Sequence, residues 1–305
     1  MNLFSIILSI VSLSVPSMSF VENAPYLSND SVRADRVVQA TENTIPPTKL
    51  DVNSLGPRIS AESAIVVDAK SGAVLYGKKD TAVWPMASIV KLMTALVFLE
   101  TEPVLDARVE MNDEDERKGG EDYIRPGETA TLRDVLTASL LGSANNATIL
   151  LSRSAGMTTE EFVNRMNEKA SELGMKSTKF VEPSGLSPEN VSTAHDIVRL
   201  LSATGASELI ADITGIHQDT IRVFPSGLSR RVITTNHLLG TIVFVEYGKT
   251  GYLDESLYSL AASVSTRQGN ELYIVLLGSE SDADRVQDAK NLTVWSQKVY
   301  QWDEL

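Results

Sequence analysis

Ser88 and Lys91 are the residues of this chain whose types and spacing could support nucleophilic chemistry. Side chains three positions apart on a helix share one face, so the serine hydroxyl and the lysine amine would lie within hydrogen-bonding reach. The lysine is flanked on both sides by apolar residues, and burial among them would lower the pKa of its amine. A neutral amine can accept the proton of a serine hydroxyl, so the pattern predicts a serine nucleophile with a lysine base. The four-residue pattern alone arises by chance about once in a chain of this length.

A second motif, Ser143-Ala144-Asn145, follows an apolar run at a glycine that separates two predicted helices. A buried serine and asparagine at such a break need hydrogen-bond partners, and a reaction centre would supply them. The alternative interpretation is that these side chains cap the helix that begins next.

Lys249, Thr250 and Gly251 form a third motif, which follows a predicted strand. An ammonium group and a hydroxyl suit a substrate carboxylate, and a glycine allows the backbone to approach a ligand closely. The segment 70–72 has the same pattern, but it precedes the first motif and lies in a predicted hairpin turn. We therefore interpret that earlier segment as structural.

The composition excludes several classes of function. The formal net charge of −13 argues against a nucleic-acid partner, because nucleic-acid binding normally uses a basic face. The chain has no cysteine, which excludes thiol nucleophiles, thiolate zinc sites and disulfides. Its three histidines lack the spacing of a zinc peptidase, so neither a metal nor a cofactor is expected.

Three regions can be distinguished along the chain. Residues 1–20 are apolar and nearly uncharged, which is typical of a signal peptide or an N-terminal anchor. Residues 21–57 are rich in Asn, Ser, Thr and Pro and are predicted to form a flexible linker. Residues 58–305 carry all three motifs and are predicted to form the catalytic domain.

Within the predicted domain, strands lie near both ends and helices lie between them. Helices are expected over 85–100, 131–154 with a break near Gly142, 159–173 and 282–300. Strands are expected over 64–68, 73–76, 242–245, 257–264 and 271–277. This order predicts an α/β (α+β) fold, with one sheet built from distant parts of the chain and covered by helices.

The order and spacing of the three motifs resemble those of penicillin-binding proteins and serine β-lactamases. The similarity extends over about residues 59–303. Through 86–95, 126–147 and 180–196 it is closest to the S11-type D-alanyl-D-alanine carboxypeptidases, and 235–238 resembles their endopeptidase branch. The resemblance implies the serine β-lactamase/DD-peptidase-like fold, an antiparallel sheet flanked by helices with an all-helical lobe over about 88–200.

The resemblance also implies three catalytic roles. Ser88 would attack the peptide carbonyl, with Lys91 as its base. Ser143 would then pass a proton towards the leaving amine.

Five further residues would bind the substrate. Asn145 would orient the base and the substrate amide, while Lys249 and Thr250 would hold the terminal carboxylate beside Gly251. The backbone N–H of Tyr252, together with that of the nucleophile, would form the oxyanion hole.

The function implied is that of a carboxypeptidase acting on peptidoglycan stem peptides through an acyl-enzyme, with β-lactams as covalent inhibitors. Such an enzyme would work outside the cytoplasm, in the periplasm or at the outer face of the cytoplasmic membrane. Membrane attachment through the N-terminal segment is one option for this chain.

Three alternatives stay open. One is a D,D-endopeptidase that cleaves peptidoglycan cross-links. Another is a class A-like β-lactamase, because Glu182-Pro183 resembles the dipeptide whose carboxylate activates the deacylating water. The last is a non-catalytic β-lactam-sensing module, since Asp254-Glu255 and Leu257 depart from the family pattern after the third motif.

Overall fold

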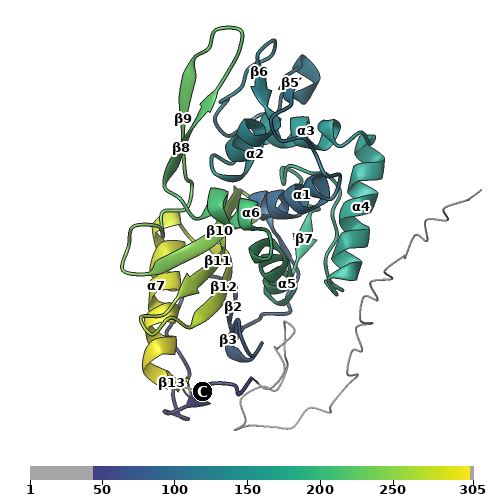
Figure 1. The fold of residues 1–305 in the computed structure, drawn as a ribbon. Coiled ribbons are helices and arrows are strands. Elements are labelled where there is room, and N and C mark those ends of the chain that lie inside the picture. The colour runs from purple at the N-terminus through teal and green to yellow at the C-terminus, as the bar shows by residue number, and fades with distance from the viewer. Residues whose placement is uncertain (1–43, 303–305) are drawn as a thin grey trace, which may run out of the picture. The chain divides into compact units, whose positions relative to one another are not determined.

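The computed structural model describes residues 44–302. Its centre is a five-stranded antiparallel sheet of order β10-β11-β12-β2-β3, in which strands from distant parts of the chain lie side by side (Figure 1). The strands are β2 (Ser63–Asp68), β3 (Val74–Lys78), β10 (Phe244–Leu253), β11 (Leu257–Ser265) and β12 (Glu271–Ser279). The predicted α/β (α+β) fold is confirmed.

Helices cover both faces of the sheet. On one face, α7 (Asp282–Val299) packs against β11 and β12. On the other, α5 (Ala194–Gly205) packs against β2, β11 and β12 and joins the sheet to the helical lobe. That lobe also contains η1 (Ala87–Ile89), α1 (Val90–Leu99), α2 (Leu132–Leu140), α3 (Asn145–Ser154), α4 (Thr159–Glu172) and α6 (Glu208–Thr214).

Alternate residues of β2 show how the sheet is buried on both sides. Ile65 and Val67 join the apolar core of the helical lobe, whereas Ala64 and Val66 join the core beneath α7. A strand covered on both faces reads as a continuous apolar run, which is why this segment could be predicted. Each fully buried aliphatic side chain of this kind contributes about 1.5–3 kcal/mol.

Two predicted boundaries are wrong in ways that affect the motifs. The helix expected from Pro85 begins as the 3₁₀ turn η1, because Trp84–Pro85 forms the short strand β4, which pairs with β7 (Val191–Ser192). The strand expected over 242–245 is instead β10, which contains the third motif. The polar residues in the second half of β10 gave no apolar pattern, so the sequence did not predict that the strand continues through them. Backbone pairing with β11 extends the strand to Leu253.

Two further small antiparallel pairs were also not predicted. The hairpin of β8 (Gln218–Arg222) and β9 (Ser229–Ile233) is mostly exposed, so it has no apolar pattern. β5 (Arg108–Glu110) pairs with β6 (Thr129–Thr131) inside the lobe that was expected to be all-helical, and η2 (Asp113–Asp115) lies between them. The lobe is therefore predominantly rather than entirely helical.

The end of the predicted linker 21–57 contains an ordered strand. β1 (Thr48–Lys49) pairs with β13 (Tyr300–Gln301), and the N–H of Leu50 donates to the carbonyl of Val299. A two-residue strand is too short to show a hydrophobic period. The predicted segment 1–20 lies outside the described residues. Between residues 44 and 302, no helix is both long enough and apolar enough to cross a membrane.

Candidate active site

Lys91 is fully buried in α1, and its Nζ has three hydrogen-bond partners. These are Ser88 Oγ at 2.9 Å, Asn145 Oδ1 at 2.8 Å and the carbonyl oxygen of Ser184 at 2.5 Å. The first contact follows from local structure, because η1 runs directly into α1 and the two side chains lie three positions apart. The other two come from the start of α3 and from the turn after α4. Three distant segments thus converge on one amine.

The acceptors around Lys91 determine where a neutral amine would direct its lone pair. The Ser184 carbonyl can only accept. Asn145 presents its Oδ1 here because its Nδ2 donates to two backbone carbonyls of the segment 118–119. A neutral amine has two protons for these two acceptors, which leaves its lone pair for the hydroxyl proton of Ser88.

The pKa of Lys91 fits this arrangement. Burial lowers the pKa to about 7, and the negative charge of Glu182 acts in the opposite direction. A substantial fraction of the amine is therefore neutral near pH 7, as a general base requires. Ser88 itself is only partly buried, so its hydroxyl can be reached from solvent although the amine of Lys91 cannot.

Ser143 and Lys249 form a second hydroxyl–amine pair, with Oγ and Nζ 2.9 Å apart. The amine is buried on β10 and also donates to the carbonyl of Thr250 at 3.1 Å. Burial, followed by the positive charges of Lys91 and Arg285, lowers the pKa of Lys249 well below its ordinary value. Two lysines with lowered pKa values thus lie behind two accessible serine hydroxyls, which suits proton transfer.

The backbone is strained at two points of the site. Ala87, directly before Ser88, has φ of 46°, and Ser143 has φ of 58°. This left-handed conformation costs a residue with a Cβ about 1–2 kcal/mol. Such strain persists where surrounding contacts enforce it, and it is frequent at reactive sites.

Gly185 and Gly251 allow two segments to touch the backbone beside Ser88. A Cβ at position 185 would lie 2.2 Å from the carbonyl oxygen of Ala87. A Cβ at position 251 would lie 3.0 Å from the carbonyl oxygen of Met86 and 3.1 Å from the nitrogen of Ser88. The third motif therefore passes directly beside the N–H group that the resemblance assigns to the oxyanion hole.

We expect Gly251→Ala to slow acylation about tenfold, because the added methyl group must displace the backbone of Ser88 from its reactive geometry. The measurement is the second-order rate constant for labelling by a fluorescent penicillin, and the melting temperature controls for the fold. An acylation rate equal to that of the wild type would mean that the close contact at Gly251 has no catalytic consequence.

The remaining predicted residues lie along the end of β10. Thr250 Oγ1 is 2.6 Å from Thr235 Oγ1, which fixes the hydroxyl at the edge of the sheet. The hydroxyl of Tyr252 donates to Asp254 Oδ1 at 2.7 Å, and its ring packs against that of Tyr258 with centroids 4.5 Å apart. One of the carboxylates that depart from the family pattern thus orients the half-exposed side chain of Tyr252.

Arg285 was not singled out in the sequence. Its Nη1 donates to the carbonyls of Gly251 at 3.0 Å and Ser259 at 3.1 Å, so this buried side chain joins α7 to the third motif. A cation near the N-terminus of a helix is unfavourable with respect to the helix dipole. That unusual placement is the signal by which the sequence could have revealed it.

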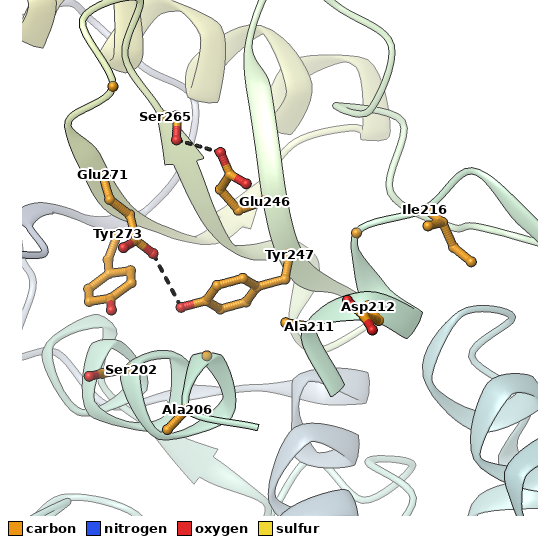
Figure 2. A pocket seen from close by; sticks show the side chains of 13 residues that line it. Ser202, Ala206, Ala211, Asp212, Ile216, Glu246, Tyr247, Ser265, Glu271 and Tyr273 are labelled. Atoms are coloured by element: carbon orange, nitrogen blue, oxygen red, sulfur yellow. Dashed lines mark hydrogen bonds between the residues drawn. The ribbon is translucent and has the colours of Figure 1, made fainter. Parts of the chain in front are cut away.

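A cavity of about 720 Å³ lies away from the three motifs, between α5, α6 and the ends of β10, β11 and β12 (Figure 2). In it, the hydroxyl of Tyr247 donates to Glu271 Oε1 over 3.4 Å. Tyr247 also packs on α5 so closely that a Cβ at Gly205 would lie 2.0 Å from its hydroxyl oxygen. Since Tyr247 lies two positions before Lys249, this contact anchors the strand that carries the third motif.

Comparisons with known proteins identify the family of this chain. The sequence profile of the family described as D-alanyl-D-alanine carboxypeptidase matches residues 51–281. A D-alanyl-D-alanine endopeptidase of Pseudomonas aeruginosa is 32% identical over 82% of this chain and 81% of its own. The D-alanyl-D-alanine carboxypeptidase DacF of Bacillus subtilis is 31% identical over 74% of this chain and 59% of its own.

Solved structures show the same fold. A D-alanyl-D-alanine carboxypeptidase of Mycobacterium tuberculosis superposes with a TM-score of 0.74 at 27% identity, covering 88% of this chain and all of the other. A Streptomyces DD-transpeptidase, 24% identical, has a TM-score of 0.76 over 80% of this chain and 99% of its own. With a profile that matches most of its length, this chain belongs to the D-alanyl-D-alanine carboxypeptidase family.

Proposed function

We propose that this chain is a serine-type D-Ala-D-Ala carboxypeptidase that acts on peptidoglycan stem peptides through an acyl-enzyme on Ser88. The observation that carries the proposal is the hydrogen bond between Ser88 Oγ and the buried Nζ of Lys91. Family membership supports D-Ala-D-Ala peptidase activity, binding of β-lactams and action outside the cytoplasm.

Acylation would begin with proton transfer from Ser88 Oγ to neutral Lys91 Nζ as the oxygen attacks the carbonyl carbon. The carbonyl oxygen becomes an oxyanion, which the N–H groups of Ser88 and Tyr252 would stabilise. Thr250 and Lys249 would hold the terminal carboxylate so that the scissile bond lies over the nucleophile.

The acyl-enzyme forms when the carbon–nitrogen bond breaks. The leaving amine takes a proton from Ser143 Oγ, which lies 2.9 Å from Lys249 Nζ. The proton that Lys91 accepted from Ser88 then replaces the one given up by the Ser143–Lys249 pair, so Lys91 is neutral again before water attacks. Asn145 keeps Lys91 aligned during this step through its Oδ1. Water then attacks the ester, the same base removes its proton, and the serine hydroxyl is restored.

Two measurements on the wild-type protein test this proposal. A penicillin adduct should map by mass spectrometry to the tryptic peptide 80–91, in which Ser88 is the only serine. A pentapeptide ending in D-Ala-D-Ala should release D-Ala. Absence of any adduct, or an adduct on another peptide, would contradict the proposed nucleophile.

A D,D-endopeptidase is the second candidate, because relatives of similar identity carry that name, among them one from Escherichia coli that is 31% identical over 78% of this chain. The two activities share the acyl-enzyme and differ in the leaving group. Hydrolysis of a cross-linked dimer in preference to a pentapeptide would favour the endopeptidase.

The N-terminal segment 1–20 is proposed to direct export, either as a cleaved signal peptide or as a retained anchor. The mass of the mature protein from an envelope fraction distinguishes these two fates. A full-length protein in the soluble cytoplasmic fraction would contradict both.

A further inference from the structure

The carboxylate of Glu182 is held by five donors from its own turn, the segment 182–190. Oε2 accepts from the N–H of Ser184 at 2.7 Å and from its Oγ at 2.5 Å. Oε1 accepts from the N–H groups of Gly185 at 2.6 Å and Ser187 at 3.2 Å and from Asn190 Nδ2 at 2.6 Å. A carboxylate offers about four lone-pair positions, so both oxygens are fully engaged within the turn.

The turn that Glu182 organises lies against both reacting residues. Its Ser184 carbonyl is the acceptor 2.5 Å from Lys91 Nζ. Its Gly185 is packed so closely that a Cβ there would lie 3.0 Å from the nitrogen of Ser88. The position of this turn therefore sets the geometry of the base and of the nucleophile together.

We infer that Glu182 is a positioning residue for the general base: by ordering the turn 182–190, it aims the Ser184 carbonyl at Lys91 and so directs the amine lone pair to Ser88. The inference rests on the proposed acylation of Ser88. Without the carboxylate, the donors of the turn lose their common acceptor, and the Ser184 carbonyl is no longer fixed.

The same contacts argue against Glu182 as the base that activates a deacylating water. Such a base needs an available lone pair in reach of the water. Here the five donors of the turn use both oxygens, and the side chain faces the backbone that it organises. The Glu-Pro dipeptide that suggested a β-lactamase therefore has a different explanation in this chain.

The pH dependence of acylation distinguishes the proposed role of Glu182 from a purely structural one, because a purely structural role would leave the inflection of the pH profile unchanged. The carboxylate of Glu182 raises the pKa of Lys91 against the effect of burial, and the charged forms of Lys91 and Lys249 on β10 disfavour each other. Removal of the negative charge lowers the pKa of Lys91, so that the amine becomes neutral at lower pH. The rise of the acylation rate with pH should move in the same direction.

The test measures acylation by a fluorescent penicillin as a function of pH, and separately the deacylation rate. For Glu182→Gln we expect a plateau acylation rate about 10–100-fold lower, and an inflection about one unit lower in pH. Glu182→Asp keeps the charge but is shorter, so its plateau should fall while its inflection stays near that of the wild type. Glu189→Gln, an exposed neighbour in the same turn, is the matched control and should behave as wild type.

Wild-type plateau and inflection in a folded Glu182→Gln would overturn the inference. So would normal acylation with an accumulating acyl-enzyme, because that result assigns Glu182 to deacylation. If Glu182→Gln does not fold, Glu182→Asp decides: an unchanged plateau overturns the inference. Failure of the wild type to acylate at Ser88 would instead contradict the proposed function, so the two failures can be told apart.

Discussion

Ser88→Ala should abolish covalent labelling by penicillin and lower D-Ala-D-Ala hydrolysis by about four orders of magnitude or more, because it removes the hydroxyl on which the proposed acyl-enzyme forms. The Oγ of Ser88 is the acceptor nearest to the surface among the three partners of Lys91, and its removal leaves the amine hydrogen-bonded to Asn145 and Ser184. The variant should therefore fold. Labelling, peptide hydrolysis and the melting temperature are the measurements.

Thr81→Ala is the matched control for this experiment. Thr81 is the other hydroxyl residue of the tryptic peptide 80–91 and is exposed, so its loss should change neither labelling nor hydrolysis. Labelling of Ser88→Ala at the wild-type rate would refute the proposed nucleophile.

Lys91→Met should lower the acylation rate about 10³-fold, because it removes the proposed general base while nearly keeping the length of the side chain. The binding groups on β10 remain, so non-covalent affinity for the substrate should change far less than the acylation rate. Rapid-mixing measurements of labelling at several penicillin concentrations separate these two quantities.

The pH dependence identifies the group that titrates. In the wild type the acylation rate should rise through an inflection near pH 7, where Lys91 loses its proton. In Lys91→Met this inflection should disappear. An inflection that persists in the variant would assign the titration to another residue.

The same lowered pKa predicts an effect on stability. The folded state holds Lys91 at a pKa of about 7, below its value in the unfolded chain, so the unfolded state binds more protons between these two values. The free energy of unfolding contributed by this group therefore rises with pH above 7. In urea titrations, Lys91→Met should lose stability relative to the wild type as the pH is raised from 7 towards 10. A constant difference between the two proteins would contradict the assigned pKa.

The sequence predicted the class of the fold because buried helices and strands carry apolar residues at recognisable spacings. The strand at Ser63–Asp68 is covered on both faces, and α4 carries apolar residues at helical spacing. Both elements could therefore be predicted from their own residues alone. The hairpin of β8 and β9 is exposed and the pair of β1 and β13 is two residues long. Neither leaves a clear pattern, because each strand of the hairpin fully buries a single residue and a two-residue strand is too short to show a hydrophobic period.

The sequence by itself also determined the residue types of the site and their order along the chain. The contact between Ser88 and Lys91 follows from one turn of helical geometry and needs no tertiary information. The contact between Ser143 and Lys249 joins residues 106 positions apart, and only the tertiary fold brings the segment before α3 next to β10.

Only the tertiary structure decided the surroundings of Lys91, the base that we propose for Ser88. The lowered pKa of Lys91 requires complete burial, and the direction of its lone pair requires acceptors from α3 and from the turn that Glu182 organises. A backbone carbonyl such as that of Ser184 has no residue-specific signature in a sequence. Long-range contacts of this kind are fixed by chain packing, which local residue patterns do not encode.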